Sequence, residues 1–280
     1  MSTFDFKVRS SITNAMKNKF GLGILLRPLS ILQFRKGKQR SAKAGEYTNS
    51  QDYSDMTEEE RNIIIAVQGY TMTSLERQIS LSRIVDYVVA NNIKGDLVEC
   101  GVWRGGCSMI MAQKLLTLNA IRRIWLYDTF DGMTPPDDKY DISYDGQTAS
   151  SLLQEQYSNK SDSVVWAVGS LEEVKKNIEK TGYSIEYLEF IQGDICQTVP
   201  SSHMPSEISV LRLDTDWYSS TLHELHAFYH LVTPGGFIII DDYGHWEGSK
   251  RAVDEFLETL RPRPYLHRID YTCRVIQKGQ

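Results

Sequence analysis

Residues 96–108 read DLVECGVWRGGCS, a short apolar run followed at once by a turn that holds three glycines. The apolar run indicates a buried strand. Gly101 permits a tight turn, and Gly105 and Gly106 let the backbone come close to a ligand where the next helix begins. The stretch therefore predicts the first strand–turn–helix unit of a ligand-binding α/β domain.

From residue 96 onward, short apolar runs alternate with helical stretches, the pattern of a parallel sheet with helices on both faces. Four further strands are expected at Arg123–Tyr127, Glu186–Gln192, Val210–Leu213 and Gly236–Ile240. Tyr265–Tyr271 and Thr272–Gln277 follow each other with almost no connection, which indicates an antiparallel pair at the sheet edge. We predict an α/β Rossmann-like fold of the class I methyltransferase type, with a mostly parallel seven-stranded sheet and an antiparallel C-terminal edge.

Two helices are expected before the first strand. Thr57 can cap a helix and Glu60, three residues later, completes a capping box. A second helix is predicted from Ser74 to Asn91 because its apolar residues recur at helical spacing. The domain should therefore carry an N-terminal helical extension.

The composition bounds the class of protein. The chain has 280 residues, 41% of them hydrophobic, and a net charge of −5. This charge argues against a nucleic-acid partner, because general nucleic-acid binders carry a basic surface. The four cysteines are widely spaced without a CxxC motif, which excludes a zinc or disulfide framework and favours reduced thiols in a cytoplasmic protein.

Basic residues gather at the N-terminus, where residues 1–43 hold ten Lys and Arg against the single acid Asp5. The apolar stretch Phe20–Leu32 is interrupted by Arg27 and Pro28, so it is too short to span a bilayer and reads poorly as a secretory signal. We expect residues 1–50 to form a basic arm and linker, and residues 51–280 the enzyme domain. The arm would pack on its own domain or on a second subunit of a homo-oligomer. The alternative is peripheral contact with an anionic membrane.

The glycine turn has features that favour S-adenosylmethionine over a dinucleotide. Its spacing, GxxxGG, differs from GxGxxG, and Glu99 would repel a pyrophosphate but attract an ammonium group. Asp128, at the end of the second strand, could bind ribose hydroxyls, although it could also be a turn or cap residue. Asp194 could accept a hydrogen bond from the adenine amino group. We also predict Ser108 and Ser170 at the cofactor.

Four carboxylates follow two of the predicted strands: Asp214 and Asp216 after VLRL, and Asp241 and Asp242 after FIII. The carboxyl ends of neighbouring parallel strands meet at the ligand crevice, so these acids should lie close together. Like charges this close are unfavourable unless a cation joins them, and oxygen ligands suit magnesium or calcium. The alternative is a set of turn acids that face water.

These motifs carry a family resemblance. The stretches LVECGVWRGG, YDTFDGM, LRLDTDWYSST and TPGGFIIIDDYGHWEGSKRAVDEF, together with GYTMTSLER, resemble the macrocin O-methyltransferase (TylF/MycF-type) family of sugar O-methyltransferases. The resemblance covers roughly residues 55 to 277 and leaves out the basic arm before Ser50. It implies magnesium-dependent transfer of a methyl group from S-adenosylmethionine to a sugar hydroxyl of a glycan or a glycosylated natural product.

The resemblance also implies roles for individual residues. Asp214, Asp241 and Asp242 would hold the metal, and Asp216 would act as general base. His245 is a competing base, because a neutral imidazole can remove a proton near pH 7; its alternative is a structural role beside Trp246. By analogy with the family, three more residues approach the cofactor: Thr71, Met72 and Ser74.

The long polar segment 132–148, GMTPPDDKYDISYDGQT, is predicted to be a mobile loop over the site, or else a plain surface insertion. Two other functions stay open at this point. A catechol or other phenolic diol could replace the sugar as acceptor. A nucleotide-binding module without catalysis, or a dehydrogenase, would need the glycine turn but not the cluster of acids.

Overall fold

A seven-stranded sheet organises the part of the chain that the computed structural model describes, which is residues 54–163, 165–201 and 203–279. In the order of the sheet, the strands are β3 (Leu188–Gln192), β2 (Ile124–Asp128), β1 (Asp96–Cys100), β4 (Ile208–Leu213), β5 (Val232–Ile240), β7 (Arg274–Gln277) and β6 (His267–Arg268). Strands β1 to β5 pair in parallel, whereas β7 runs antiparallel to β5 and β6 antiparallel to β7. The predicted fold class is confirmed.

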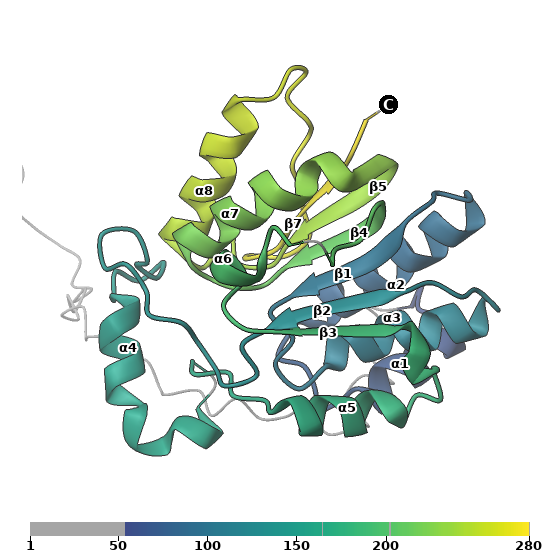
Figure 1. Ribbon diagram of the computed structural model, residues 1–280, viewed down its shortest axis with the longest axis horizontal. Coiled ribbons are helices and arrows are strands. Elements are labelled where there is room, and N and C mark those ends of the chain that lie inside the picture. Colours follow the sequence, from purple (N-terminus) through teal and green to yellow (C-terminus); the bar gives the residue numbers. More distant parts are fainter. Residues whose placement is uncertain (1–53, 164, 202, 280) are drawn as a thin grey trace, which may run out of the picture. The chain divides into compact units, whose positions relative to one another are not determined.

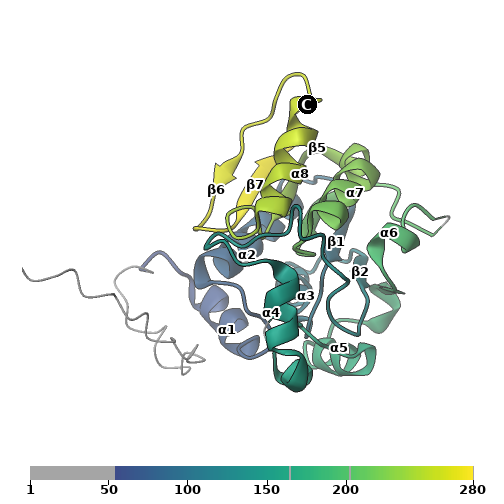
Figure 2. The same ribbon diagram turned by 90° about the vertical axis from the view of Figure 1, so that its left-hand side faces the viewer.

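Helices cover both faces of this sheet (Figure 1). One face carries α1 (Glu58–Ala66), α2 (Leu75–Ala90), α3 (Gly106–Thr117) and α5 (Leu171–Glu179), and the other carries α6 (Ile195–Thr198), α7 (Tyr218–Phe228) and α8 (Glu247–Glu258). A separate buried apolar cluster fills each interface. Helix α4 (Ala149–Glu155) lies beyond the carboxyl ends of the parallel strands, and Figure 2 shows it in front of them. Short 3₁₀ helices span Tyr157–Asp162, Ile185–Tyr187 and Tyr229–Leu231.

The helix starts follow the sequence signals. Thr57 caps α1: its hydroxyl accepts from the Glu60 N–H, and the Glu60 carboxylate accepts from the Thr57 N–H, which is the predicted capping box. Ser74 caps α2 by accepting from the Arg77 N–H. These caps satisfy backbone donors that the first turn of a helix leaves without partners.

Strand lengths differ from expectation mainly at the sheet edge. β1 has the predicted bounds, and β4 and β5 begin earlier than expected, at Ile208 and Val232. The predicted strand Tyr265–Tyr271 is reduced to His267–Arg268. Both residues of β6 are exposed, so burial does not favour a longer strand there.

The strand order reverses beside β1, because β2 and β3 lie on one side of it and β4 and β5 on the other. In an open parallel sheet, ligands bind outside the carboxyl ends of the strands at such a reversal. The glycine turn after β1 and the acids after β4 and β5 all lie at this end of the sheet.

Two predictions concern the N-terminus. The basic arm, residues 1–50, lies outside the described residues. In the ranges that are described, none of the helices has both the length and the apolar character needed to span a bilayer.

Candidate active site

A pocket opens at the carboxyl ends of four parallel strands. Gly101 after β1, Asp128 at the end of β2, Asp194 after β3 and Asp214 after β4 all line it. Gly101 has φ +83°, and a Cβ there would lie 2.0 Å from the Asp214 carbonyl oxygen. Only glycine therefore allows the two turns to approach each other across the strand reversal.

Asp128 holds the glycine turn in place while facing this pocket. One of its oxygens accepts from the N–H groups of Val102 and Trp103, at 2.6 and 3.2 Å, and the other accepts from the Phe130 N–H at 2.6 Å. Burial raises the pKa of Asp128, although these hydrogen bonds oppose the shift. The Thr129 hydroxyl also lies 3.4 Å from the second oxygen, and a carboxylate offers about four lone-pair sites, so a ribose hydroxyl would have to compete with the contacts of the turn.

Glu99 and Ser108 lie in the core beneath the glycine turn, and neither lines the pocket. The Ser108 hydroxyl donates to Glu99, whose other oxygen contacts Arg212 at 2.8 Å. Burial raises the pKa of Glu99, and the charge of Arg212 opposes that rise. The predicted attraction of Glu99 for a ligand ammonium group would have to compete with these internal partners.

The other predicted cofactor residues surround the start of α3 or cap nearby helices. The Gly106 N–H donates to the Tyr70 carbonyl at 2.9 Å, and a Cβ on Gly106 would lie 2.6 Å from the Thr71 Cβ. The segment that holds Thr71 and the half-exposed Met72 is thereby packed on the glycine turn. Ser74, Ser170 and Asp194 are the N-caps of α2, α5 and α6.

Asp214, Asp216 and Asp242 form an acidic cluster next to the pocket, because one oxygen from each lies within 4.8 Å of the others. Burial and neighbouring carboxylates raise the pKa of Asp214 and of Asp242 well above the usual range, and raise that of Asp216 to about 7. The Oδ2 atom of Asp242 is buried without a hydrogen-bond partner among the described residues. An oxygen-only donor set with crowded negative charge fits a hard divalent cation.

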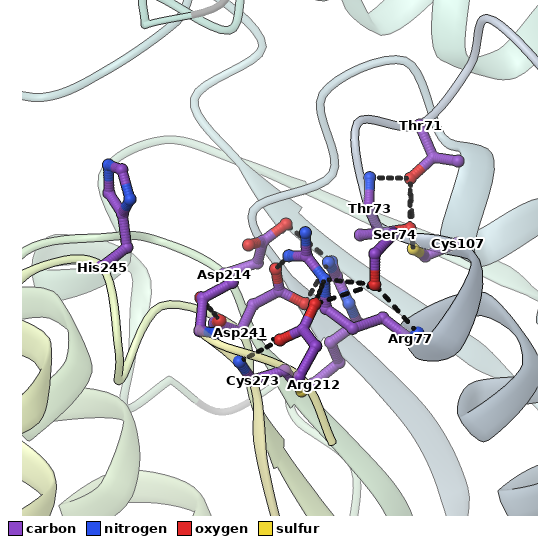
Figure 3. Close-up of polar contacts among 12 residues, drawn as sticks. Thr71, Thr73, Ser74, Arg77, Cys107, Arg212, Asp214, Asp241, His245 and Cys273 are labelled. Carbon is purple, nitrogen blue, oxygen red and sulfur yellow. Dashed lines mark hydrogen bonds and ion pairs between the residues drawn. The ribbon is translucent and has the colours of Figure 1, made fainter. Parts of the chain in front are cut away.

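Asp241 was predicted as a metal ligand, but its oxygens contact two arginines. Arg212 Nη2 lies 2.9 Å from Oδ1, and Arg77 forms an ion pair with Oδ2 (Figure 3). Burial alone would raise the pKa of Asp241, but the two guanidinium groups outweigh it and lower the pKa. The geometry therefore favours Asp216 over Asp241 as the third member of the cluster.

Arg212 is the functional residue that the sequence analysis missed. It is fully buried on β4 and contacts Glu99, Asp214 and Asp241, each at 2.8 or 2.9 Å. It supplies the positive charge that lets several carboxylates share a buried site. The signal was present, since Arg212 interrupts the apolar run VLRL just before the acids.

The two predicted bases differ in their surroundings. Asp216 belongs to the acidic cluster and has a left-handed backbone, with φ +67°, which is uncommon outside glycine and concentrates at functional sites. His245 stands to one side of Asp214 and Asp241 (Figure 3). Burial lowers the pKa of His245, so its imidazole is neutral near pH 7, and its Nδ1 atom lies 3.3 Å from the Tyr271 hydroxyl.

The segment 132–148 is tied to the domain at several points. The buried Asp141 carboxylate accepts from the Tyr218 and Asp137 N–H groups, both at 2.8 Å. The Trp217 indole donates to the Thr134 carbonyl at 2.9 Å, and the Tyr144 N–H donates to the His245 carbonyl at 2.8 Å. These contacts place the segment beside the acidic cluster, and its predicted movement stays a prediction.

Comparison with known proteins identifies the family. The family model described as Macrocin-O-methyltransferase (TylF) matches residues 18–278. The chain belongs to this family. The match begins well before residue 55, so it extends the resemblance into the basic arm. The demethyldecarbamoylnovobiocin O-methyltransferase of Streptomyces niveus is 34% identical over 67% of this chain and 68% of its own length.

Two other curated relatives are also named as O-methyltransferases, and one of the names includes a rhamnosyl group. The 8-demethyl-8-(2,3-dimethoxy-alpha-L-rhamnosyl)-tetracenomycin-C 4'-O-methyltransferase of Streptomyces olivaceus is 35% identical over 67% of both chains. The mycinamicin III 3''-O-methyltransferase of Micromonospora griseorubida is 31% identical over 62% of this chain and 65% of its own.

Solved structures agree with this assignment. The O-methyltransferase NovP has a TM-score of 0.64 and 32% identity over 75% of this chain and 83% of its own. The calicheamicin methyltransferase CalS11, at 15% identity and a TM-score of 0.56 over 83% of this chain and 95% of its own, shares the fold. The chain is thus an S-adenosylmethionine-dependent O-methyltransferase, and the pocket at the glycine turn is its candidate cofactor site.

Proposed function

We propose that this enzyme is a metal-dependent O-methyltransferase that transfers the methyl group of S-adenosylmethionine to a sugar hydroxyl of a glycan or a glycosylated natural product. The observation that carries the proposal is the position of Asp214. It lines the cofactor pocket and also belongs to the acidic cluster of Asp214, Asp216 and Asp242. A hydroxyl held at the cluster would therefore lie beside the methyl donor.

The acceptor class is supported by a relative that is 35% identical and carries a rhamnosyl group in its name. A sugar hydroxyl is a weak acid and a weak nucleophile, so transfer requires help with both positioning and proton removal. Bringing reactants together in the correct geometry can contribute up to about 7–11 kcal/mol.

The chain supplies residues for both tasks. Asp214 and Asp242 would hold Mg²⁺, which, when bound, would lower the pKa of a coordinated hydroxyl and fix its direction. Asp216 is the proposed base, because its carboxylate belongs to the cluster that would receive the hydroxyl. His245 is the second candidate, since its neutral imidazole can accept a proton near pH 7. Arg212 and Arg77 hold Asp241 beside the cluster.

Calorimetry on the full chain tests the two-part site. We expect wild-type protein to bind S-adenosylmethionine and Mg²⁺, and the variant Asp242→Asn, whose side chain does not line the cofactor pocket, to bind the cofactor within about threefold of wild type while losing Mg²⁺ binding. Glu258→Gln, an exposed change near the end of α8, is the matched charge control and should bind both ligands normally. Equal Mg²⁺ affinity in wild type and Asp242→Asn would contradict the metal assignment.

The turnover numbers of single variants distinguish Asp216 from His245 as the general base. With methyl rhamnosides as acceptors and S-adenosylhomocysteine release as the readout, Asp216→Asn should lower kcat by about 10²-fold or more, the usual contribution of general base catalysis. His245→Gln should have a smaller effect. The reverse order would assign the base to His245, and turnover of catechols without any sugar would reject the sugar acceptor.

A further inference from the structure

Three aromatic rings gather beside the acidic cluster without belonging to it. The Tyr144 ring centroid lies 5.3 Å from that of His245 and 6.2 Å from that of Tyr271, and His245 and Tyr271 lie 6.3 Å apart. They are called the aromatic cluster below. Tyr144 is 67% exposed and Tyr271 55% exposed.

Burial in the core explains why the rings of Trp217 and Trp246 lie together, but it does not explain why Tyr144 and Tyr271 do. Trp217 and Trp246 lie 5.0 Å apart and are 1% and 5% exposed, so they form part of the apolar core under α4. Tyr144 and Tyr271 instead present large apolar surfaces to solvent. Exposed apolar residues that gather in one place commonly mark a binding site.

The backbone fixes the aromatic cluster, although its rings come from three segments. The Tyr144 N–H donates to the His245 carbonyl at 2.8 Å, and the Gly244 N–H donates to the Thr272 carbonyl at 2.8 Å. A Cβ on Gly244 would lie 1.9 Å from the Tyr271 carbonyl oxygen, so glycine permits this close approach. The three segments that carry the rings are therefore joined before any ligand binds, which reduces the entropy lost on binding.

The aromatic cluster is continuous with the candidate site. The His245 N–H donates to the Asp242 carbonyl at 3.0 Å, so the imidazole is one turn away from an acid of the cluster. On the Tyr271 side, Asp270 forms an ion pair with Arg77 at 3.0 Å, and Arg77 in turn contacts Asp241. A ligand that reaches the acids with one hydroxyl could place the rest of its body on these rings.

We propose that the aromatic cluster is the acceptor platform, on which the C–H face of a pyranose ring stacks against Tyr144 and Tyr271. A pyranose combines an apolar face with hydroxyl edges, which matches exposed tyrosine rings next to a polar site. This inference rests on the proposed function, because it assigns the sugar ring of the same acceptor to specific side chains. The hydroxyl of Tyr271 would orient His245 rather than bind the sugar, since it already contacts Nδ1.

Saturation-transfer NMR on the full chain, with methyl α-L-rhamnopyranoside as probe, tests the platform. The experiment includes Mg²⁺ and S-adenosylhomocysteine, so that the cofactor pocket is filled. We expect transfer to the ring C–H protons of the sugar and a Kd at least fivefold weaker in both Tyr144→Ala and Tyr271→Ala. Tyr271→Phe keeps the ring and should stay within twofold of wild type.

Tyr265→Ala is the matched control, because Tyr265 is 80% exposed on the segment before β6 and is not part of the aromatic cluster. S-adenosylmethionine affinity, measured by calorimetry, should be unchanged in every variant. No transfer to the sugar in wild type, or equal Kd values in wild type, Tyr144→Ala and Tyr271→Ala, would overturn the platform.

The same data separate this inference from the proposed function. Ring-dependent sugar binding without methyl transfer would support the platform and count against the catalytic proposal. Methyl transfer to a rhamnoside with a KM that is unchanged in both alanine variants would support the catalytic proposal and overturn the platform. Ring-dependent transfer to catechol but not to the rhamnoside would also overturn it, because a planar phenol would then be the ligand.

Discussion

Glu224 shows how one buried side chain supports the acids without belonging to their cluster. It lies on α7 with 0% exposure, and its Oε1 atom accepts from the Thr215 hydroxyl at 2.9 Å. Thr215 stands between Asp214 and Asp216, so this hydrogen bond fixes the turn that carries both acids. The other oxygen of Glu224 has no hydrogen-bond partner among the described residues. Burial raises the pKa of Glu224 well above its ordinary value, so the folded protein holds this proton to higher pH than the unfolded chain does.

The raised pKa of Glu224 predicts that the effect of Glu224→Gln on the free energy of unfolding depends on pH. The unfolded chain releases the Glu224 proton near pH 4.5 whereas the folded chain keeps it, so this group destabilises the fold increasingly as pH rises above 4.5. Glutamine keeps the shape and the acceptor for Thr215 and does not ionise. The free energy of unfolding of the Glu224→Gln variant, relative to that of the wild type, should therefore rise from pH 5 to pH 8, by up to about 1.4 kcal/mol per pH unit.

Urea unfolding at the two pH values measures this difference. Glu224→Ala is the contrasting change, because it also removes the ionisable group but leaves the partly buried Thr215 hydroxyl without its acceptor, so it should be about 1–3 kcal/mol less stable than Glu224→Gln at both pH values. A glutamine variant whose relative stability is the same at pH 5 and pH 8 would show that Glu224 is ionised in the folded protein.

At the level of single residues, the sequence located the acids but not their partners. Asp214, Asp216, Asp241 and Asp242 could be placed together because each follows an apolar strand. Which of them is compensated by arginine depends on contacts between strands and helices distant in sequence. Arg77 lies on α2, 164 residues before Asp241 in the sequence. No local sequence motif could therefore predict that these two side chains form an ion pair.

At the level of elements, the strand–turn–helix unit from β1 to α3 carries the cofactor site. Gly101→Ala would place a Cβ 2.0 Å from the Asp214 backbone and force the turns apart. We expect this variant to bind S-adenosylmethionine at least tenfold more weakly and to lose several kcal/mol of stability.

Gly182→Ala is the matched control for this substitution. Gly182 has a similar φ, +80°, but a Cβ there would meet nothing within 4 Å. It should show only the strain of a left-handed alanine, about 1–2 kcal/mol, with unchanged cofactor affinity. Calorimetry and urea unfolding of the two variants make the comparison. Equal cofactor affinities would mean that the close approach of the turns does not shape the pocket.

The parallel strands could be predicted because buried strands are continuous apolar runs between glycine and helix signals. The antiparallel pairing of the two C-terminal strands was predicted, but the length of β6 was not. Strand β6 is exposed, so no burial pattern marks its ends. Helix α4 follows the long polar segment 132–148, and its position depends on contacts such as the pairing of Ile142 with Thr148. Such isolated backbone bridges leave no periodic signal in the sequence.

At the level of the whole molecule, the helical extension is part of the enzyme domain. Helix α1 contacts α2 and α3, and its Ile63 joins the apolar cluster that covers one face of the sheet. The division between residues 1–50 and 51–280 stays a prediction, as do the membrane contact and the homo-oligomer. The family match from residue 18 indicates that part of the basic arm is shared with other members.

A single buried lysine ties this extension to the methyltransferase core. Lys114 on α3 is 4% exposed, and its Nζ lies 2.6 Å from Glu59 on α1 and 2.8 Å from Asp86 on α2. The hydrogen bond from Lys114 lowers the pKa of Glu59. Burial would lower the pKa of Lys114, but Asp86 and Glu59 outweigh it and raise the pKa. These ion pairs therefore stabilise the fold at pH values above the pKa of Glu59 and below the pKa of Lys114 in the folded protein.

Lys114→Met should cost about 1 kcal/mol at pH 7, a modest loss because both acids are more than 40% exposed. Glu59 stabilises the fold above pH 4.5, and this contribution disappears as pH falls through its lowered folded pKa. The difference between wild type and variant should therefore be constant from pH 5 to pH 9 and shrink below about pH 4.5. Lys250→Met, which removes an exposed pair with Asp254 inside α8, should have a smaller effect. Urea unfolding across this pH range is the measurement. A Lys114→Met penalty no larger than that of Lys250→Met would mean that the ion pairs of Lys114 do not help to hold the helical extension on the core.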